Sequence, residues 1–243
     1  MKRREFFKSA VVSLAAVSYP SWKGYADDNT IPIEIPAVTG SRQPIAIERI
    51  AVEEFRKSLN GRLLLPEDDD YQVARLVRNR SIDKRPALIA QCRNSEDVQA
   101  CVNFAHHYQL LTAVKCGAHS VSGKGTCDGG LLIDLSPLQG VSVNPTKRRI
   151  FVTGGSLLGR LDEATLPLGL GTTAGTVSHT GVGGLTLGGG FGRLGRRFGL
   201  TLDNLKSVEI VTADGQLRYA DAEENSELFW GVRGGGGNFG VVT

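Results

Sequence analysis

The 243-residue sequence predicts an α+β fold. Segments with the two-residue alternation of strands and segments with the 3.6-residue spacing of helices follow one another, without the regular alternation of a doubly wound sheet. The composition, 41% hydrophobic and 22% charged, is that of a globular chain with one large core or two small ones. No repeat of solenoid length occurs. We therefore expect one or two α+β domains.

The first 26 residues have the features of a sorting signal and are excluded from the predicted fold. Residues 2–4 (Lys-Arg-Arg) precede an apolar run, residues 10–17, and residues 24–26 resemble a small-residue cleavage site. Residues 3–8 resemble the twin-arginine pattern, although an ordinary secretory signal with two arginines is the alternative. We expect the twin-arginine machinery as a partner, a periplasmic location and no stable membrane anchor, because no later run nears 18 apolar residues.

The basic character of the chain belongs to this signal. The full sequence carries a net charge of +3, and residues 1–26 hold five of its basic side chains and one acidic side chain. The remainder therefore has a net charge of about −1. The clusters at residues 147–149 and 193–197 are best explained as solvated surface, so a nucleic-acid partner is excluded.

The four cysteines are Cys92, Cys101, Cys116 and Cys127. None forms a Cys-x-x-Cys pair or a zinc-like spacing with histidine, so no metal site is expected. An oxidising compartment would allow disulfides, and all three possible pairings stay open.

Residues 27–80 are predicted to be an N-terminal helical segment, because their apolar residues follow helical spacing. These residues are Ile47, Ile50, Ala51, Phe55 and Leu59. A polar turn over residues 66–70 ends the unit.

Residues 81–145 predict a strand-helix-strand unit. A strand over residues 87–90 leads to a helix capped by Asn94 or Ser95, with acidic residues in its first turn. The buried face of that helix is expected to hold Val98, Cys101, Val102 and Ala105. Strands over residues 111–115 and 131–135 flank a glycine-bearing turn.

Residues 146–243 predict a second mixed unit. A strand over residues 149–153 precedes a helix over residues 156–165, whose inward residues are Leu157, Leu158 and Leu161. A hairpin follows, with arms at residues 205–212 and 216–220 around an Ala-Asp-Gly turn. A short helix over residues 226–232 precedes the last glycines.

Glycine accounts for 31 of the 243 residues and is densest at residues 181–192 and 234–240. Glycine has no Cβ, so successive N–H groups can converge on a pyrophosphate and a flat ring can lie against the main chain. The runs also hold apolar residues that a flexible linker lacks. These are Val182, Leu185, Leu187, Phe191 and Phe239. We expect ligand-facing loops.

Two Gly-x-Gly-x-x-Gly matches begin at Gly190 and Gly235. They would suggest a nicotinamide dehydrogenase, but that fingerprint needs a strand before it and a helix after it. Neither match has this predicted context. Both are considered accidental, and the nicotinamide enzyme is the weaker alternative.

His119 lies in a turn directly after the predicted strand at residues 111–115. A lone histidine in a turn is either a hydrogen-bonded structural residue or a functional one. Its position alone leaves both interpretations open.

The order of motifs resembles the FAD-linked oxidoreductases of the vanillyl-alcohol-oxidase superfamily, and more closely their berberine-bridge-enzyme-like branch. The motifs are Arg85-Pro86-Ala87 with Ile89, Gly117-Ala118-His119-Ser120 with Gly123, and residues 132–136, 174–192, 199–205 and 227–242. The motifs occur in the same order as in that family, so the resemblance spans residues 80–243, which correspond to the N-terminal part of such proteins.

This resemblance implies a PCMH-type FAD-binding domain over residues 81–243, with subdomains 81–145 and 146–243 and the pyrophosphate between them. It also implies that His119 is joined covalently to the flavin. The other cofactor-binding residues that it implies are Gly117, Ala118, Ser120, Gly123, Gly175, Thr180, Gly181, Gly183, Gly184, Gly188, Asn238, Gly240 and Val242. A covalent tether would prevent loss of FAD after export, where no free pool restores it.

The sequence departs from the family pattern in the same motifs. Some members have a second link from a cysteine that precedes the Gly-Val-Gly-Gly run by four residues, and here that position is Val177, so a single tether is expected. Lys115, Cys116 and Ala118 replace the more usual arginine and glycines. His179 is either a neighbour of the flavin or a loop-bracing residue and is given no role.

The activity implied is that of an FAD-dependent oxidase or dehydrogenase, which takes hydride from a C–H bond of a small alcohol, sugar or amine and passes electrons to oxygen or another acceptor. Family members continue into a substrate-covering domain that supplies the catalytic base. We expect that domain to be missing here, which leaves the catalytic residues unknown. A truncated, non-catalytic FAD-binding module is the alternative.

Overall fold

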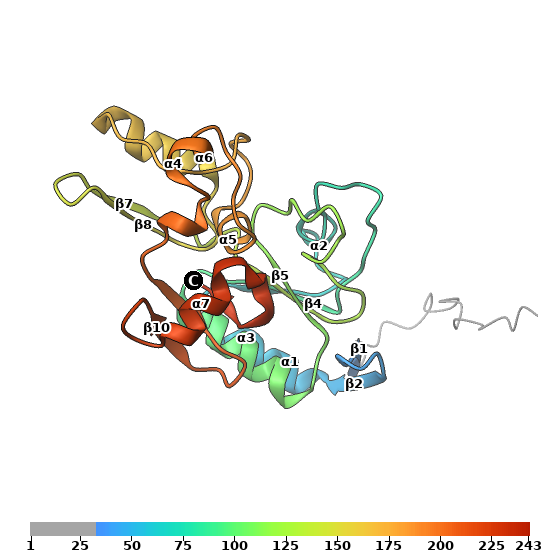
Figure 1. Cartoon of the computed structure of the whole chain (residues 1–243). Helices are drawn as coiled ribbons and strands as arrows, with labels where there is room; N and C mark the ends of the chain where they lie inside the picture. The colour runs from blue at the N-terminus through green and yellow to red at the C-terminus, as the bar shows by residue number, and fades with distance from the viewer. Residues whose placement is uncertain (1–32) are drawn as a thin grey trace, which may run out of the picture. The chain divides into compact units, whose positions relative to one another are not determined.

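The computed structural model describes residues 33–243 (Figure 1). The predicted export signal, residues 1–26, lies outside the described residues. Helices and strands are mixed, with the strands in a four-stranded sheet, a three-stranded sheet and two hairpins, so the α+β prediction is confirmed. No helix among residues 33–243 is long and apolar enough to span a bilayer.

The predicted helical segment also contains strands. An antiparallel hairpin of β1 (Glu34–Val38) and β2 (Pro44–Glu48) precedes helix α1 (Arg49–Ser58). Ile47 therefore belongs to β2, and Ile50 is 67% exposed, while Val52 and Phe55 form the buried face of α1. The predicted spacing was wrong because strand and helix meet without a turn residue between them. Strand β3 (Arg62–Leu64) and helix α2 (Tyr71–Ala74) complete the segment.

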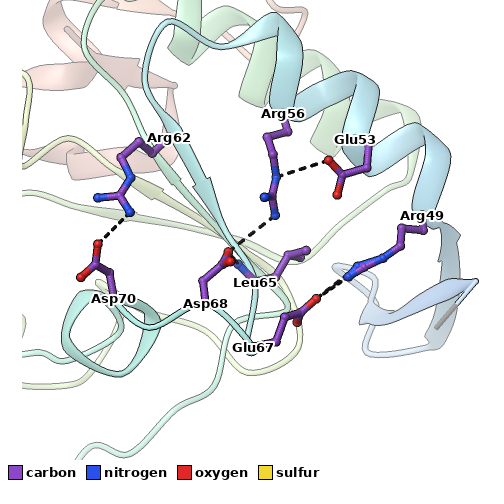
Figure 2. Close-up of polar contacts among 8 residues, drawn as sticks. All are labelled: Arg49, Glu53, Arg56, Arg62, Leu65, Glu67, Asp68 and Asp70. Carbon is purple, nitrogen blue, oxygen red and sulfur yellow. Dashed lines mark hydrogen bonds and ion pairs between the residues drawn. The ribbon is translucent and has the colours of Figure 1, made fainter. Parts of the chain in front are cut away.

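The polar turn at residues 66–70 is present, and ion pairs link its acidic side chains to arginines of α1 and β3 (Figure 2). The pairs are Arg49–Glu67, Arg56–Asp68 and Arg62–Asp70. Asp68 also accepts the N–H of Leu65 at 2.8 Å, which closes the turn. Ion pairs this accessible to water contribute at most about 1 kcal/mol each, so they orient the turn more than they stabilise it.

The central sheet has the order β3-β4-β6-β5. Its later strands are β4 (Leu88–Gln91), β5 (Thr112–Lys115) and β6 (Leu131–Asp134), which lie within a residue of the predicted bounds. Both β4 and β5 pair parallel with β6. Core clusters cover both faces, with Leu131 and Ile133 in one cluster and Leu132 in the other. Because both faces are buried, β6 has a continuous apolar run and not an alternating pattern.

Helix α3 (Ser95–His107) contacts α1, β6 and β9 (Val208–Val211), and α1 and α3 lie side by side in Figure 1. Asn94 caps it by accepting the Asp97 N–H at 2.9 Å, a contact worth about 1 kcal/mol. Val98, Cys101 and Ala105 are buried as predicted, and Val102 is partly buried. The buried Asp97 carboxylate accepts the amides of Asn60 and Arg93, so its desolvation is compensated.

A second hairpin pairs β7 (Val141–Asn144) with β8 (Arg149–Val152). Only β8 was predicted, and the hairpin straddles the proposed subdomain boundary at residue 145. Helix α4 (Leu158–Thr165) buries Leu158 and Leu161 as expected. Leu157 precedes the helix and forms an isolated bridge with Gly181.

The three-stranded sheet has the order β10-β9-β11, from β9 (Val208–Val211), β10 (Leu217–Ala220) and β11 (Val241–Val242). The predicted hairpin is confirmed, with β9 and β10 antiparallel. Helix α7 (Ser226–Gly235) packs Phe229 and Val232 on this sheet. It kinks at Arg233 and Gly234, which leave helical angles.

Part of the glycine run predicted as a loop is helix α5 (Val182–Leu187). Val182, Thr186 and Leu187 are buried at helical spacing, and the Thr186 hydroxyl donates to the Val182 carbonyl at 2.8 Å. The 3₁₀ turn η3 (Gly236–Asn238) lies in the second glycine run, and helix α6 (Gly195–Phe198) and the 3₁₀ turn η2 (Leu202–Asn204) follow the first. Helix α5 precedes the Gly190 match and strand β11 follows the Gly235 match, so neither has a strand-turn-helix context.

All four cysteines are free thiols. Cys92 and Cys101 meet in the core with a 3.7 Å Sγ–Sγ distance. Their hydrogen bond, together with burial, raises the pKa of Cys101 well above its usual value. Both side chains are buried and pack in the core.

Candidate cofactor-binding site

The turn that carries His119 begins at a buried ion pair. Lys115 Nζ lies 3.0 Å from Asp134 Oδ2, and the two residues are register partners on β5 and β6. Lys115 also donates to the Ala74 carbonyl, and Asp134 Oδ1 accepts the Ser136 N–H at 3.0 Å. Both charged side chains are almost fully buried, so their ion pair fixes the end of β5. Lys115 does this from the position where the family more usually has arginine.

Two glycines bring this turn against the loop before α5. A Cβ on Gly117 would overlap the backbone nitrogen of Gly181 and lie 2.9 Å from the carbonyl oxygen of His179. A Cβ on Gly181 would overlap the Cys116 sulfur and the Gly117 nitrogen. Any side chain at either position would push the two segments apart. Predicted site residues from both predicted subdomains are therefore in direct contact.

This contact places His119 beside His179. Nε2 of His119 lies 2.6 Å from Nδ1 of His179, and the rings are stacked with centroids 4.8 Å apart and planes 24° apart. Burial lowers the pKa of His119, and the charges of His179 and Arg78 lower it further. Burial therefore favours the neutral imidazole of His119, and in a neutral pair one ring donates an N–H to a bare nitrogen of the other.

The neighbouring Ala118 has a left-handed backbone, with φ of +59°. Its carbonyl accepts the Arg78 N–H at 3.0 Å, which holds the turn in this conformation. An L-residue is disfavoured there relative to glycine. The more usual glycine at this position therefore has a conformational reason, and Ala118 adopts the same turn with strain.

Three glycines near these turns have no packing reason. An added Cβ at Gly184, Gly236 or Gly237 would meet no atom within 4 Å. Gly184 belongs to α5 and the other two to η3, and α5 and η3 are in contact. The first-turn amides of a helix have no acceptor within it. These positions leave both space and N–H donors for a ligand.

Four other predicted glycines face the protein itself. An added Cβ would meet Ile82 at Gly123, Leu185 at Gly175, the Gly154 carbonyl at Gly183 and the Val211 carbonyl at Gly240. Gly183 and Gly240 are needed for the fold whether or not a cofactor binds, because the opposing atoms are backbone, and Gly123 has a positive φ of +70°. At Gly175 the opposing atoms are leucine side-chain ends, which can shift. A role for them toward a ligand stays a prediction.

The remaining predicted residues lie in these turns or at the elements next to them. The Thr180 carbonyl accepts the Leu158 N–H at 2.9 Å, and Ser120 Oγ accepts the Lys124 N–H at 3.0 Å. Asn238 is exposed and donates to the Gly235 carbonyl at 2.7 Å. Gly188 caps the end of α5, and Val242 lies on β11.

Sequence reasoning gave no role to Cys116, Asp134 or His179. Burial raises the pKa of Cys116 to about 11, and its thiol donates to the Ser156 carbonyl, so Cys116 is a neutral packing group under Gly181. Asp134 ends a continuous apolar strand, a position where a charge needs a buried partner. That pattern is a signal by which the Lys115 pair could have been found.

The structure also has a surface hollow away from this site, and no cluster of metal ligands among its described residues. A hollow of about 380 Å³ near α4 is lined by Gln139, Gly140, Val141, Arg160, Glu163 and Ala164, none of them a predicted site residue. Within residues 33–243, no three His, Cys, Asp or Glu side chains gather as metal ligands do.

The sequence matches the family described as FAD binding domain over residues 86–221, more than half of the chain. The chain therefore belongs to the FAD-linked oxidoreductases with a PCMH-type FAD-binding domain. Within them it falls among the berberine-bridge-enzyme-like proteins, as its relatives and structural neighbours indicate. The recognition made from the motifs is confirmed.

An FAD-linked oxidoreductase of Dictyostelium discoideum is 41% identical over 193 residues, which are 79% of this chain and 42% of that protein. The crystal structure of 6-hydroxy-D-nicotine oxidase from Arthrobacter nicotinovorans superposes with a TM-score of 0.75 at 35% identity, covering 76% of this chain and 41% of the other. Xylooligosaccharide oxidase from Myceliophthora thermophila superposes with a TM-score of 0.72 at 31% identity, covering 79% of this chain and 41% of the other. This chain thus spans about two fifths of these proteins' length.

The site residues fit FAD. Open glycines on α5 and η3 offer main-chain donors of the kind that bind phosphate oxygens. The partly exposed imidazole of His119 lies at the meeting point of two close-packed turns. Both features suit a dinucleotide with a flat ring system.

Proposed function

We propose that this chain is the FAD-holding part of an FAD-dependent oxidoreductase and that His119 alone tethers the cofactor covalently. The observation that carries the proposal is the position of His119, whose partly exposed imidazole lies at the contact of two glycine turns and beside His179. Burial lowers its pKa, which favours the neutral form. A neutral imidazole nitrogen has a lone pair for bond formation, whereas an imidazolium has none. Val177 occupies the position of the second family tether, so one bond is proposed.

The protein's own residues bind and orient the cofactor. Gly184, Gly236 and Gly237 would present main-chain amides to it, because packing leaves their faces open. Thr180 and Asn238 would add short polar groups from the flanking loops. When bound, FAD supplies the acceptor of a hydride from a substrate C–H bond.

The proposed substrate is a small alcohol, sugar or amine, with oxygen or another acceptor removing the electrons. Support comes from the names of similar proteins, a 6-hydroxy-D-nicotine oxidase and a xylooligosaccharide oxidase, which act on an amine and on sugars. The same scaffold thus serves both substrate classes.

We also propose export to the periplasm by the twin-arginine route, from residues 3–8. A variant with Arg3→Lys and Arg4→Lys should stay in the cytoplasm when cell fractions are probed by immunoblot. Unchanged delivery of this variant to the periplasm would contradict the proposal.

The test of the tether is acid denaturation. The full chain, purified after expression with ample flavin, should keep yellow absorbance on the precipitated protein. His119→Ala should lose it, whereas His106→Ala, a matched exposed histidine on α3, should keep it. Flavin that washes out of the unaltered chain would exclude the tether, and absence of flavin before denaturation would exclude FAD binding.

Turnover is tested separately by adding sugars, alcohols or amines and following the flavin absorbance. Bleaching that recovers in air would support an oxidoreductase. Stable absorbance with every substrate class would favour the non-catalytic FAD-binding module.

A further inference from the structure

The His119–His179 contact joins residues that lie 60 positions apart. The loop of His179 is fixed on both sides by backbone hydrogen bonds. Gly159 N–H donates to the Ser178 carbonyl at 2.7 Å, and Leu158 N–H donates to the Thr180 carbonyl at 2.9 Å. With the Gly117–Gly181 contact on the other side, the two imidazoles are held together by their backbones.

The hydrogen bond between the rings decides which nitrogen of His119 is free. A neutral imidazole carries one proton on its two nitrogens. If His119 donates from Nε2, its Nδ1 keeps a lone pair. If His119 accepts at Nε2, its proton is on Nδ1, and no lone pair is available for a new bond.

The donating form of His119 requires His179 to accept at Nδ1. The proton of His179 is then on Nε2, on a side chain that is exposed to water. His179 can therefore accept a second proton at Nδ1 and release one from Nε2 to solvent. The pair has the connectivity of a short proton relay that ends in water.

Formation of the proposed tether releases a proton from His119, and such a relay can carry it away. A bond forms between His119 Nδ1 and the methyl carbon of the flavin's dimethylbenzene ring, and one C–H bond of that methyl breaks. In the net reaction the imidazole loses its N–H proton and the methyl loses one hydrogen, with two electrons passing to dioxygen to give hydrogen peroxide. As Nδ1 acquires the new bond, the Nε2 proton becomes acidic and must leave.

We infer that His179 is a positioning residue for the tether: it holds His119 with Nδ1 free and takes the Nε2 proton as the bond to the cofactor forms. The inference rests on the covalent tether proposed above. It assigns a role to a residue that does not itself bond to the cofactor.

The experiment measures tether formation rather than turnover. The full chain, made under flavin starvation, is mixed with excess FAD in air, and samples are stopped with acid over time. Covalent flavin is read by in-gel fluorescence, and reversibly bound FAD is read by equilibrium dialysis of parallel samples at early times. Variants are His179→Ala, His179→Gln, His119→Ala and the control His106→Ala.

The expected result is a covalent incorporation rate about 100-fold lower in His179→Ala, the size of a lost acid-base group, with reversible FAD binding unchanged. His179→Gln, whose amide accepts a hydrogen bond but not a proton, should stay slow. Added imidazole should restore rate to His179→Ala but not to His119→Ala. His106→Ala should match the unaltered chain.

Two outcomes would overturn the inference. The first is an incorporation rate in His179→Ala within about threefold of the unaltered chain. The second is a slow His179→Ala that imidazole does not rescue although it binds FAD normally, because His179 would then only brace the loop. If His179→Ala loses FAD binding, the test is made with His179→Gln instead. A covalent incorporation rate in His179→Gln equal to that of the unaltered chain would equally exclude proton transfer to His179. Failure of the unaltered chain to acquire covalent flavin would instead refute the proposed tether itself.

Discussion

Replacing Lys115 by methionine tests how the His119 turn is anchored. Methionine keeps most of the length of the lysine stem but removes the charge that lies 3.0 Å from the Asp134 carboxylate. Asp134 is only 1% exposed, so its charge would be left in the core with the Ser136 amide and a 3.5 Å contact from Gln91. Removing one partner of a buried ion pair costs about 3–5 kcal/mol.

The expected loss is large enough to measure by thermal or urea unfolding. For a domain of this size, each kcal/mol lowers the midpoint temperature by about 2–4 °C, so Lys115→Met should lower it by roughly 6–20 °C. Lys115→Met combined with Asp134→Leu should recover much of the loss, because no uncompensated charge remains. Lys147→Met, in an exposed turn, should change stability by less than about 0.5 kcal/mol.

A loss below about 1 kcal/mol for Lys115→Met would refute this reasoning. It would mean that water reaches Asp134 or that another cation replaces the lysine. A double variant no more stable than Lys115→Met would also contradict it, since the damage would then come from packing rather than from the unpaired charge.

Three further predictions concern the same turns. Ala118→Gly should raise the free energy of unfolding by about 1 kcal/mol in urea titrations, because glycine adopts the +59° φ without strain; a decrease would be inconsistent with this backbone. Gly181→Ala should lower it by roughly 1–3 kcal/mol and weaken FAD retention in dialysis, because the new methyl overlaps Cys116; unchanged values would contradict the close contact. Burial raises the pKa of both Cys116 and Cys127 to about 11, so at pH 8 their alkylation by iodoacetamide should be at least about 100-fold slower than in the unfolded chain. Stability should fall as the pH rises from about 9 toward 11, because the folded state holds these protons more tightly. Equal alkylation rates in the folded and unfolded chains would exclude the shift.

Local patterns predicted much of the fold. Strands β4, β5 and β6, the Asn94 cap and the β9–β10 hairpin were found from apolar runs, a capping residue and a turn sequence. Each of these signals is contained in a few neighbouring residues. The β1–β2 hairpin and β7 were missed because their alternation is short, and α5 was missed because its glycines concealed the helical spacing of Val182 and Thr186.

The candidate site divides in the same way. His119 and the glycine positions could be proposed from ordered motifs, and the family so recognised is confirmed. The glycine runs alone did not separate positions left open, such as Gly184, from positions filled by the protein, such as Gly183. That difference depends on which backbone segment lies opposite.

The sequence by itself determined the α+β class, most central strands and the FAD-linked family, because periodicity and motif order are properties of the chain alone. The tertiary structure decided which side chains meet. Lys115 finds Asp134 across two strands, and His119 finds His179 across 60 residues because Gly117 and Gly181 let their backbones touch. The apolar run that ends at Asp134 signals the need for a buried partner, but which distant side chain meets it depends on how closely two segments approach, and no local pattern encodes that distance.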